Sequence, residues 1–227
     1  MTWASPWTND GEQSLSTTYR TTDRDREILS SLCVAVRLFS QSQIATHWFE
    51  NDKANTRRRM RILIAQQFVT RIEVRAKVLP ELTRPAACWR VGEPTPSFST
   101  VACQLKARWR HQVVRTLTAY VATEDAARLF GGKGVGELRK PTQAGHDLGL
   151  SQVWLRFAST NPAWARAWRG EDVMAHTRRG EKLPDAFIVN ANNQVACLIE
   201  FGGAYDQDRL IAFHNDCVER QLPYQIW

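Results

Sequence analysis

Two carboxylates stand near the ends of strand-like runs in the C-terminal part of the chain. Asp185 opens the run 185–189, and Glu200 lies near the end of the run 195–201. If the two runs pair in one sheet, the two side chains converge at one of its edges. Together they could hold Mg²⁺ or Mn²⁺, which prefer oxygen ligands, and the metal would activate water against a phosphodiester. The alternative is a turn aspartate and a solvated strand-end glutamate.

Two further groups are candidates for the same edge. Glu171 ends the preceding strand-like run, 164–171, and is a candidate third ligand. His146 opens the helix expected before that run, although a histidine in such a place more often packs or caps a helix.

A second constellation is a run of arginines on a short amphipathic segment. The apolar stripe of residues 55–68 predicts a helix, and Arg57, Arg58 and Arg61 fall off that stripe, with Arg59 between them. Arginines on such a helix can reach the phosphates and base edges of a DNA groove. The alternative is a solvated basic face with no partner.

The elements around these residues fall into two groups. In the first, helices are expected from residue 22, over 42–49 and over 55–68, followed by a hairpin of strands over 70–78 and 87–91. Three helices and a hairpin is the order of a winged helix-turn-helix. In the second, a helix over 146–157 precedes strands at 164–171, 185–189 and 195–201, a helix at 207–220 and a strand at 224–227. This α-β-β-β-α-β order predicts a compact α/β domain with a mixed sheet.

The expected fold class is therefore α/β (α+β), in four consecutive parts. We predict a mobile tail at 1–21, a winged helix DNA-binding domain at 22–96, a linking helical segment at 97–140 with a helix over 101–120, and an α/β domain at 141–227. The boundary near residue 96 rests on a run of prolines that interrupts regular structure.

Composition narrows the class of partner. Lys and Arg number 30 against 23 Asp and Glu, giving a net charge of +7 and an isoelectric point near 9.5, which favours a polyanionic partner such as double-stranded DNA. The five cysteines show no C-x-x-C spacing, so a zinc ribbon and a disulfide framework are disfavoured. No apolar run reaches about 18 residues and the first residues do not form a secretion signal. We expect a cytoplasmic protein with no membrane partner.

The acid pair resembles the PD-(D/E)xK nuclease signature. Pro184 and Asp185 match its first part and Glu200 matches its second acid, but the lysine two residues later is replaced by Gly202. The resemblance implies a metal-dependent DNA endonuclease site in which Lys182 or Arg209 would have to replace the missing base. The other outcome of this departure is a site without catalytic activity.

Taken together, the segments resemble the replication-relaxation family of plasmid and mobile-element proteins over roughly residues 22–227. The resemblance rests on Asp23–Leu29, Arg57–Met60, His146–Leu148, Trp168–Glu171, Leu183–Ala186 and Ile199–Gly203. It implies a DNA-binding winged helix joined to a nuclease-like domain, acting in plasmid replication, relaxation or mobilisation, with other mobile-element proteins as further partners.

Three classes of function follow from the sequence. The first is a DNA-binding protein of a mobile element whose nuclease-like domain does not necessarily cut. The second is an active Mg²⁺-dependent endonuclease that uses Asp185 and Glu200, and the third is a winged helix transcriptional regulator. Gly202 ranks the first class above the second.

Overall fold

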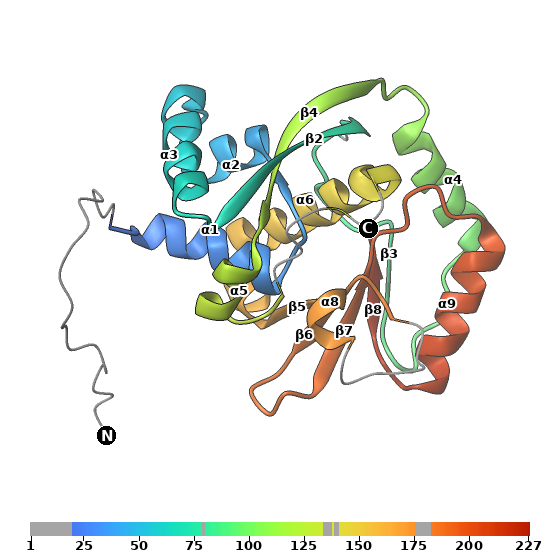
Figure 1. The fold of residues 1–227 in the computed structure, drawn as a ribbon. Coiled ribbons are helices and arrows are strands. Elements are labelled where there is room, and N and C mark those ends of the chain that lie inside the picture. Colours follow the sequence, from blue (N-terminus) through green and yellow to red (C-terminus); the bar gives the residue numbers. More distant parts are fainter. Residues whose placement is uncertain (1–19, 79, 134–137, 139–140, 176–182) are drawn as a thin grey trace.

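The computed structural model describes residues 20–78, 80–133, 138, 141–175 and 183–227. These residues form a mixed α/β fold with two separate sheets, a three-stranded and a five-stranded one (Figure 1). The predicted mixed α/β class is therefore confirmed. No helix within the described ranges has the length and the apolar character needed to cross a bilayer.

The three-stranded sheet is built with the N-terminal helices. Its elements are α1 (Asp23–Val34), β1 (Phe39–Ser40), α2 (Gln41–Trp48), α3 (Lys53–Ala65), β2 (Val69–Lys77), β4 (Val114–Ala122) and α5 (Glu124–Phe130). The strand order is β1-β4-β2, and both neighbouring pairs are antiparallel.

Local sequence fixes where α1 and α2 begin. The Thr22 hydroxyl accepts a hydrogen bond from the Asp25 amide while the Asp25 carboxylate accepts one from the Thr22 amide. Ser40 and Gln43 make the same reciprocal pair at the start of α2. Each pair satisfies amide groups that a helix start otherwise leaves without partners, so the first turns are stabilised locally.

The five-stranded sheet takes its strands from both halves of the chain. Its elements and covering helices are β3 (Ala87–Trp89), α4 (Phe98–Trp109), the 3-10 turn Pro141–Gln143, α6 (Ala144–Thr160), α7 (Pro162–Ala167), β5 (Trp168–Gly170), α8 (Glu171–Met174), β6 (Ala186–Val189), β7 (Val195–Glu200), α9 (Gln207–Glu219) and β8 (Tyr224–Ile226). The strand order is β3-β8-β7-β6-β5. Strands β7 and β8 are parallel and the other neighbours are antiparallel.

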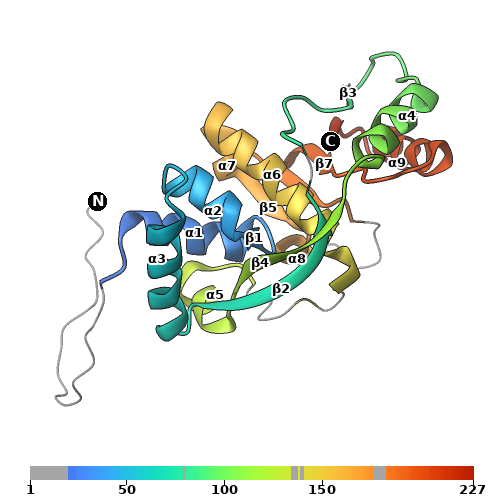
Figure 2. The same ribbon diagram turned by 90° about the horizontal axis from the view of Figure 1, so that it is seen from above.

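Helix α6 lies between the two sheets, and α4 and α9 cover the far face of the larger sheet (Figures 1 and 2). Leu148 packs against the smaller sheet, whereas Val153 and Phe157 join the cluster that includes Phe201 after β7. A Cβ at Gly149 would stand 2.1 Å from the Phe201 ring, so only glycine lets α6 approach this closely.

A single apolar cluster joins the two halves of the molecule. It contains Ile28 and Leu63 from the N-terminal helices and Trp168 and Ile199 from the larger sheet. Burying such residues contributes about 1.5 to 3 kcal/mol each, so the shared cluster holds the two sheets together as one folded unit.

The strand expected to complete a hairpin with residues 70–78 lies elsewhere. Strand β2 pairs along its whole length with β4, from Val69 opposite Ala122 to Lys77 opposite Val114. Strand β3, at the expected position 87–91, pairs instead with β8 in the other sheet. The expected hairpin was wrong because short-range spacing does not reveal a partner that lies further along the chain.

Two other expected elements are each split into shorter elements in the structure. Residues 101–120 were expected to be one helix, but α4 ends at Trp109 and β4 begins at Val114. The second part is rich in β-branched residues, which favour a pleated strand over a helix. Residues 164–171 become α7, β5 and the start of α8, because Pro162 at the first turn and the Asn161 cap start a helix there.

The boundary predicted near residue 96 does not separate the two sheets. Strand β3 precedes it and belongs to the larger sheet, whereas β4 follows it and belongs to the smaller one. The chain therefore passes from the first sheet to the second and back before it completes either. The predicted tail at 1–21 falls almost wholly outside the described residues.

Candidate functional site

Helix α3 presents a basic face. The Asp52 carboxylate accepts hydrogen bonds from the amides of Ala54 and Asn55 and starts the helix. Thr56, Met60 and Leu63 are buried against the core, which fixes the rotation of the helix. The opposite face, bearing most of the arginines, is turned to solvent.

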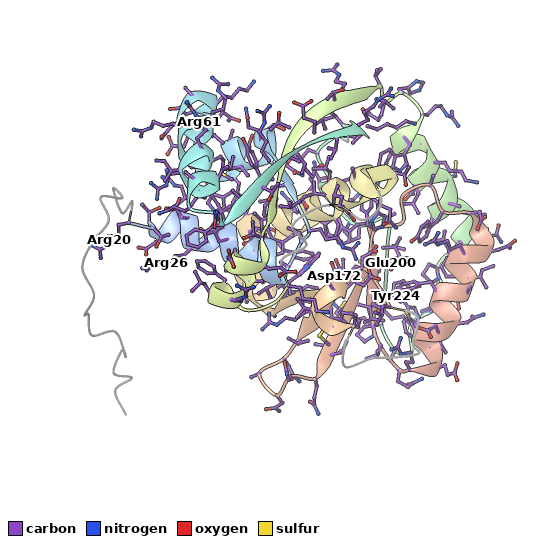
Figure 3. All side chains as sticks on the ribbon, in the orientation of Figure 1. Arg20, Arg26, Arg61, Asp172, Glu200 and Tyr224 are labelled. Carbon is purple, nitrogen blue, oxygen red and sulfur yellow. The ribbon has the colours of Figure 1, made fainter. Side chains whose placement is uncertain are left out.

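Arg57, Arg58 and Arg61 are exposed on that face. Arg58 donates to the Asn55 side-chain oxygen at 3.1 Å, and the Arg61 guanidinium lies 3.4 Å from the Arg57 carbonyl oxygen. Within the described residues none of the three forms an ion pair, so their charges are available to a partner. Figure 3 shows Arg61 directed outward at the edge of the molecule.

Arg59 differs from its neighbours and corrects the prediction that all four arginines face DNA. Its Nε donates to Asp25 Oδ1 at 2.8 Å, and its terminal nitrogen pairs with the other oxygen of that fully buried carboxylate. Burial alone would raise the pKa of Asp25, but hydrogen bonds from Arg59 and Thr22 lower it below its ordinary value. The helical rotation turns Arg59 toward α1, where it ties α3 to that helix.

The basic face continues onto the smaller sheet. Burial raises the pKa of Tyr120 on β4, and the charges of Arg71 and Arg57 oppose that shift. Arg71 on β2 therefore lies near the same tyrosine as Arg57 on α3. Arg75, four residues further along β2 and on the same face of the strand, is also exposed.

The two predicted acids come together as expected. Ala186 pairs with Ile199 across β6 and β7, so Asp185 and Glu200 stand opposite each other at the next position. The Asp185 amide donates to Glu200 Oε2 at 3.3 Å, and the Phe201 amide donates to Asp185 Oδ2 at 2.7 Å. The prediction that they converge at one sheet edge is confirmed.

Glu200 is buried and belongs to a chain of polar groups. Burial and the charge of Asp185 raise its pKa to about 8. The Tyr205 hydroxyl donates to Glu200 Oε1 at 2.7 Å, and the guanidinium of Arg209 both stacks on the Tyr205 ring and donates to its hydroxyl. Arg209, a candidate for the missing base, is thus separated from Glu200 by Tyr205.

His146 also reaches this edge. Its Nε2 lies 3.2 Å from Asp185 Oδ2, its Nδ1 lies 3.6 Å from Asp147 Oδ1, and its ring packs edge-on against Phe201. Burial lowers the pKa of His146, but the hydrogen bonds and charges of Asp147 and Asp185 outweigh it and raise the pKa to about 10. At neutral pH the histidine is therefore an imidazolium that neutralises Asp185.

Glu171 does not join the acid pair as a ligand. Its carboxylate accepts from Arg37 at 2.8 Å, and the same guanidinium binds Asp172 at 2.6 and 2.9 Å and lies 3.4 Å from Asp147. These groups surround a cavity of about 20 Å³, which Asp185 also lines. Figure 3 shows Asp172 and Glu200 in the same region of the molecule, well away from Arg61. Sequence reasoning missed Arg37, because a single arginine before a short strand carries no motif.

The glycine in place of the motif lysine is closely packed by the ends of two apolar side chains. A Cβ at Gly202 would stand 2.6 Å from Leu105 Cδ1 and 3.1 Å from Ile226 Cγ2. Helix α4 therefore fills the space that a longer side chain at this position would occupy. Lys182, the other candidate base, lies outside the described residues.

The surroundings of the Asp185 and Glu200 carboxylates do not fit a bound divalent ion. Three of the four carboxylate oxygens of Asp185 and Glu200 already accept hydrogen bonds from the protein, and the His146 imidazolium stands beside Asp185. The described part of the chain holds no group of three or more His, Cys, Asp or Glu side chains placed to bind a metal. The predicted Mg²⁺ or Mn²⁺ would have to displace these internal contacts.

Comparisons with models of known families, with curated proteins and with solved structures each gave no match.

Proposed function

We propose that the chain is a double-stranded-DNA-binding protein whose second sheet belongs to a nuclease-like core that does not cut. The observation that carries the proposal is the exposed arginine face of α3. Arg57, Arg58 and Arg61 lie together without acidic partners in the described structure, on a helix held by the core through its opposite side. Such a face suits the closely spaced phosphates along a DNA groove.

The topology around α3 supports a winged helix-turn-helix. The order α1-β1-α2-α3-β2 is followed by β4, and the sheet order β1-β4-β2 sets the two long strands beside α3. In this class of fold the later helix of the three enters the major groove. The departure is the long connection between β2 and β4, which places β3 in the other sheet and packs α4 against that sheet.

The larger sheet supports the nuclease-like part of the proposal. Its order α6-β5-β6-β7-α9-β8, with β7 and β8 parallel, follows the α-β-β-β-α-β plan expected from the sequence, with two short helices added. Internal partners of the two acids and the packed glycine at 202 favour binding without cleavage. The resemblance to the replication-relaxation family adds the context of a plasmid or mobile element, in replication, relaxation or mobilisation.

The binding test measures affinity for duplex DNA over a range of salt concentrations. Replacing Arg57, Arg58 and Arg61 with alanine should weaken binding by about 2 to 4 kcal/mol and lower the salt slope by about 1 for each lost phosphate contact. A matched control replaces Arg90, Arg128 and Arg166 with alanine, which removes the same charge from other exposed positions. Equal affinity and slope in the first variant and the wild type would overturn the proposal.

A second candidate is a Mg²⁺-dependent endonuclease, which is favoured by the direct opposition of Asp185 and Glu200. Incubation of supercoiled plasmid with Mg²⁺ or Mn²⁺, compared with EDTA, separates the two functions. We expect no metal-dependent nicking. Nicking that is lost in Asp185→Asn would establish the endonuclease in place of the non-cutting core.

A further inference from the structure

A large cavity lies between helices α2 and α6. Its volume is about 630 Å³, within the range of about 300 to 1,000 Å³ in which small-molecule sites fall. The Gln43 side chain on α2 donates to the Leu148 carbonyl oxygen on α6 at 2.9 Å, and Gln152 on α6 donates to the Pro80 carbonyl oxygen at 3.1 Å. The cavity is therefore bounded by elements that hydrogen bonds hold together, and Figure 2 shows α2 beside α6.

One face of α6 lines this cavity. The lining residues recur every three or four positions along the helix, so they share one side of it: Gly145, Leu148, Gln152, Leu155 and Ser159. Leu148 is buried and Leu155 is half-buried, whereas Gln152 and Ser159 carry polar groups. This face therefore offers apolar surface and hydrogen-bonding groups to the same ligand.

Other elements add apolar side chains to the lining. Leu82 is buried, Leu117 on β4 is half-buried, and Val78, just after β2, is 45% exposed. Apolar side chains of this kind line most small-molecule sites and cover the body of the ligand, while a few polar groups fix its orientation. The lining therefore fits an organic molecule with an apolar body.

Arg156 gives the cavity a cation without a partner. The residue is half-buried, and in the part of the chain that the structure describes its guanidinium has neither a hydrogen bond nor an ion pair. A charge that is partly withdrawn from water is costly unless it is paired, so an anion in the cavity would stabilise it. The planar fork of a guanidinium matches the two oxygens of a carboxylate.

The charge of the lining fits a ligand with one negative charge. Among the described residues that line the cavity, Lys77 and Arg156 are the cations and Glu81 is the carboxylate, which leaves one positive charge in excess. His47 adds no charge at neutral pH, because burial lowers its pKa and the charge of Glu27 opposes that shift only in part. A doubly charged phosphate would therefore carry more negative charge than the cavity balances.

We propose that this cavity binds a small organic monocarboxylate with an apolar body about the size of two fused rings. Arg156 binds the carboxylate, and Leu82, Leu148 and Leu155 cover the body. None of these residues belongs to α3, so the inference is independent of the proposed DNA binding.

The test compares two ligands of the same shape on the full chain. The first is 1-naphthoate, a carboxylate on two fused rings, and the second is 1-naphthalenemethanol, its neutral counterpart. In an NMR titration of backbone amides, 1-naphthoate should bind saturably with a Kd of about 1 mM or tighter, and the shifts should concentrate on α2 and α6. The alcohol should bind about 10-fold more weakly, because it makes no charged hydrogen bond with Arg156.

Two results of this titration would overturn the proposal. One is the absence of saturation by 1-naphthoate at about 10 mM, ten times the expected Kd. The other is equal affinity for the acid and the alcohol, which would show that the cavity does not recognise the carboxylate.

The role of Arg156 has its own variant. Arg156→Met keeps an apolar stem of similar length and should weaken binding of 1-naphthoate about 10-fold, with binding of the alcohol unchanged. The control Arg128→Met removes the same charge from an exposed position on α5 and should change neither affinity. Wild-type affinity for 1-naphthoate in Arg156→Met would contradict the proposed site.

The apolar wall is tested separately. Leu155→Ser should weaken binding of both ligands about 3- to 10-fold, because it removes apolar contact that the acid and the alcohol share. The control Leu129→Ser changes a leucine that is 62% exposed on α5 and should leave both affinities unchanged. Circular dichroism of each variant checks that the fold is intact. If a folded Leu155→Ser variant bound both ligands as the wild type does, the ligand would not lie against α6 and the proposal would be wrong.

Discussion

Helix α3 and the adjoining ends of β6 and β7 both carry several charged side chains. The charges on α3 are exposed to solvent, whereas those at the strand ends have partners inside the protein. On α3, Arg57, Arg58 and Arg61 face solvent and have no ion-pair partner in the described structure. At the sheet edge, Asp185 and Glu200 are neutralised or bonded by His146, Tyr205 and backbone amides.

The difference shows how far a sequence motif predicts that a charged group binds an external partner. The acids match a catalytic pattern in type, spacing and convergence, yet their surroundings satisfy them internally. The arginines match only a general pattern, yet their surroundings leave them open. Whether a charged group serves an external partner is therefore decided by its immediate neighbours.

The largest expected effect on stability concerns Arg59, the arginine of α3 that is paired with a buried carboxylate. Asp25→Ala should lower the free energy of unfolding by about 3 to 4 kcal/mol, because it removes a buried carboxylate that holds Arg59 and caps α1. Urea unfolding followed by circular dichroism measures it. Asp23→Ala, which removes a fully exposed partner of Arg26, is the control and should change stability by less than about 0.5 kcal/mol. A similar small change for Asp25→Ala would mean that Arg59 is as open as its neighbours.

The next largest effect on stability is expected at Gly202. Gly202→Lys, which restores the motif residue, should cost about 2 to 3 kcal/mol, because the new side chain meets Leu105 and Ile226. Adding Leu105→Ala should make the lysine less costly, and a double-mutant cycle of urea unfolding measures the coupling. The control Gly145→Ala adds a methyl group 3.9 Å from Ala76 and should be tolerated. Full stability in Gly202→Lys would show that α4 leaves the motif position open.

Replacing Arg37 is expected to lower stability less, because two of its three acidic partners, Glu171 and Asp172, are partly exposed. Arg37→Met should lower the free energy of unfolding by about 2 kcal/mol by leaving Asp147, Glu171 and Asp172 without their shared cation. Thermal unfolding should show a clear fall in Tm, whereas Arg128→Met, in an exposed pair, should show almost none. No fall in Tm would mean that these acids are solvated and not internally satisfied.

The remaining prediction concerns the pH dependence of stability. The pKa of Glu200 is raised from about 4.5 to about 8, so the folded state holds its proton more tightly than the unfolded state. This contribution to stability is complete below about pH 4.5 and is lost as the pH rises through about 8. Glu200→Gln should therefore remove the part of the fall in stability between pH 5 and 8 that this carboxyl group causes, as measured by urea unfolding at several pH values. An identical pH profile in the variant would show that Glu200 is ionised and solvated.

The sequence predicted elements and patterns better than partners. The stripe of Met60 and Leu63 placed α3. The positions of Asp185 at the head of one strand-like run and of Glu200 near the end of the next predicted that the two side chains meet. The pairing of β2 with β4 was missed because the intervening residues form other structure, and a strand partner far along the chain leaves no local pattern. Arg37 was missed for the same reason: its acids lie more than 100 residues further along the chain.

The exchange of strands between the sheets has a consequence for synthesis of the chain. As the protein leaves the ribosome, β2 has an open hydrogen-bonding edge until β4 has been made, and β3 has no partner until β8, at the end of the chain, emerges. Neither sheet can close on an N-terminal fragment that ends before residue 114. Unpaired edges of this kind recruit other strands, so interrupted synthesis would yield an aggregating intermediate and not an independent N-terminal domain.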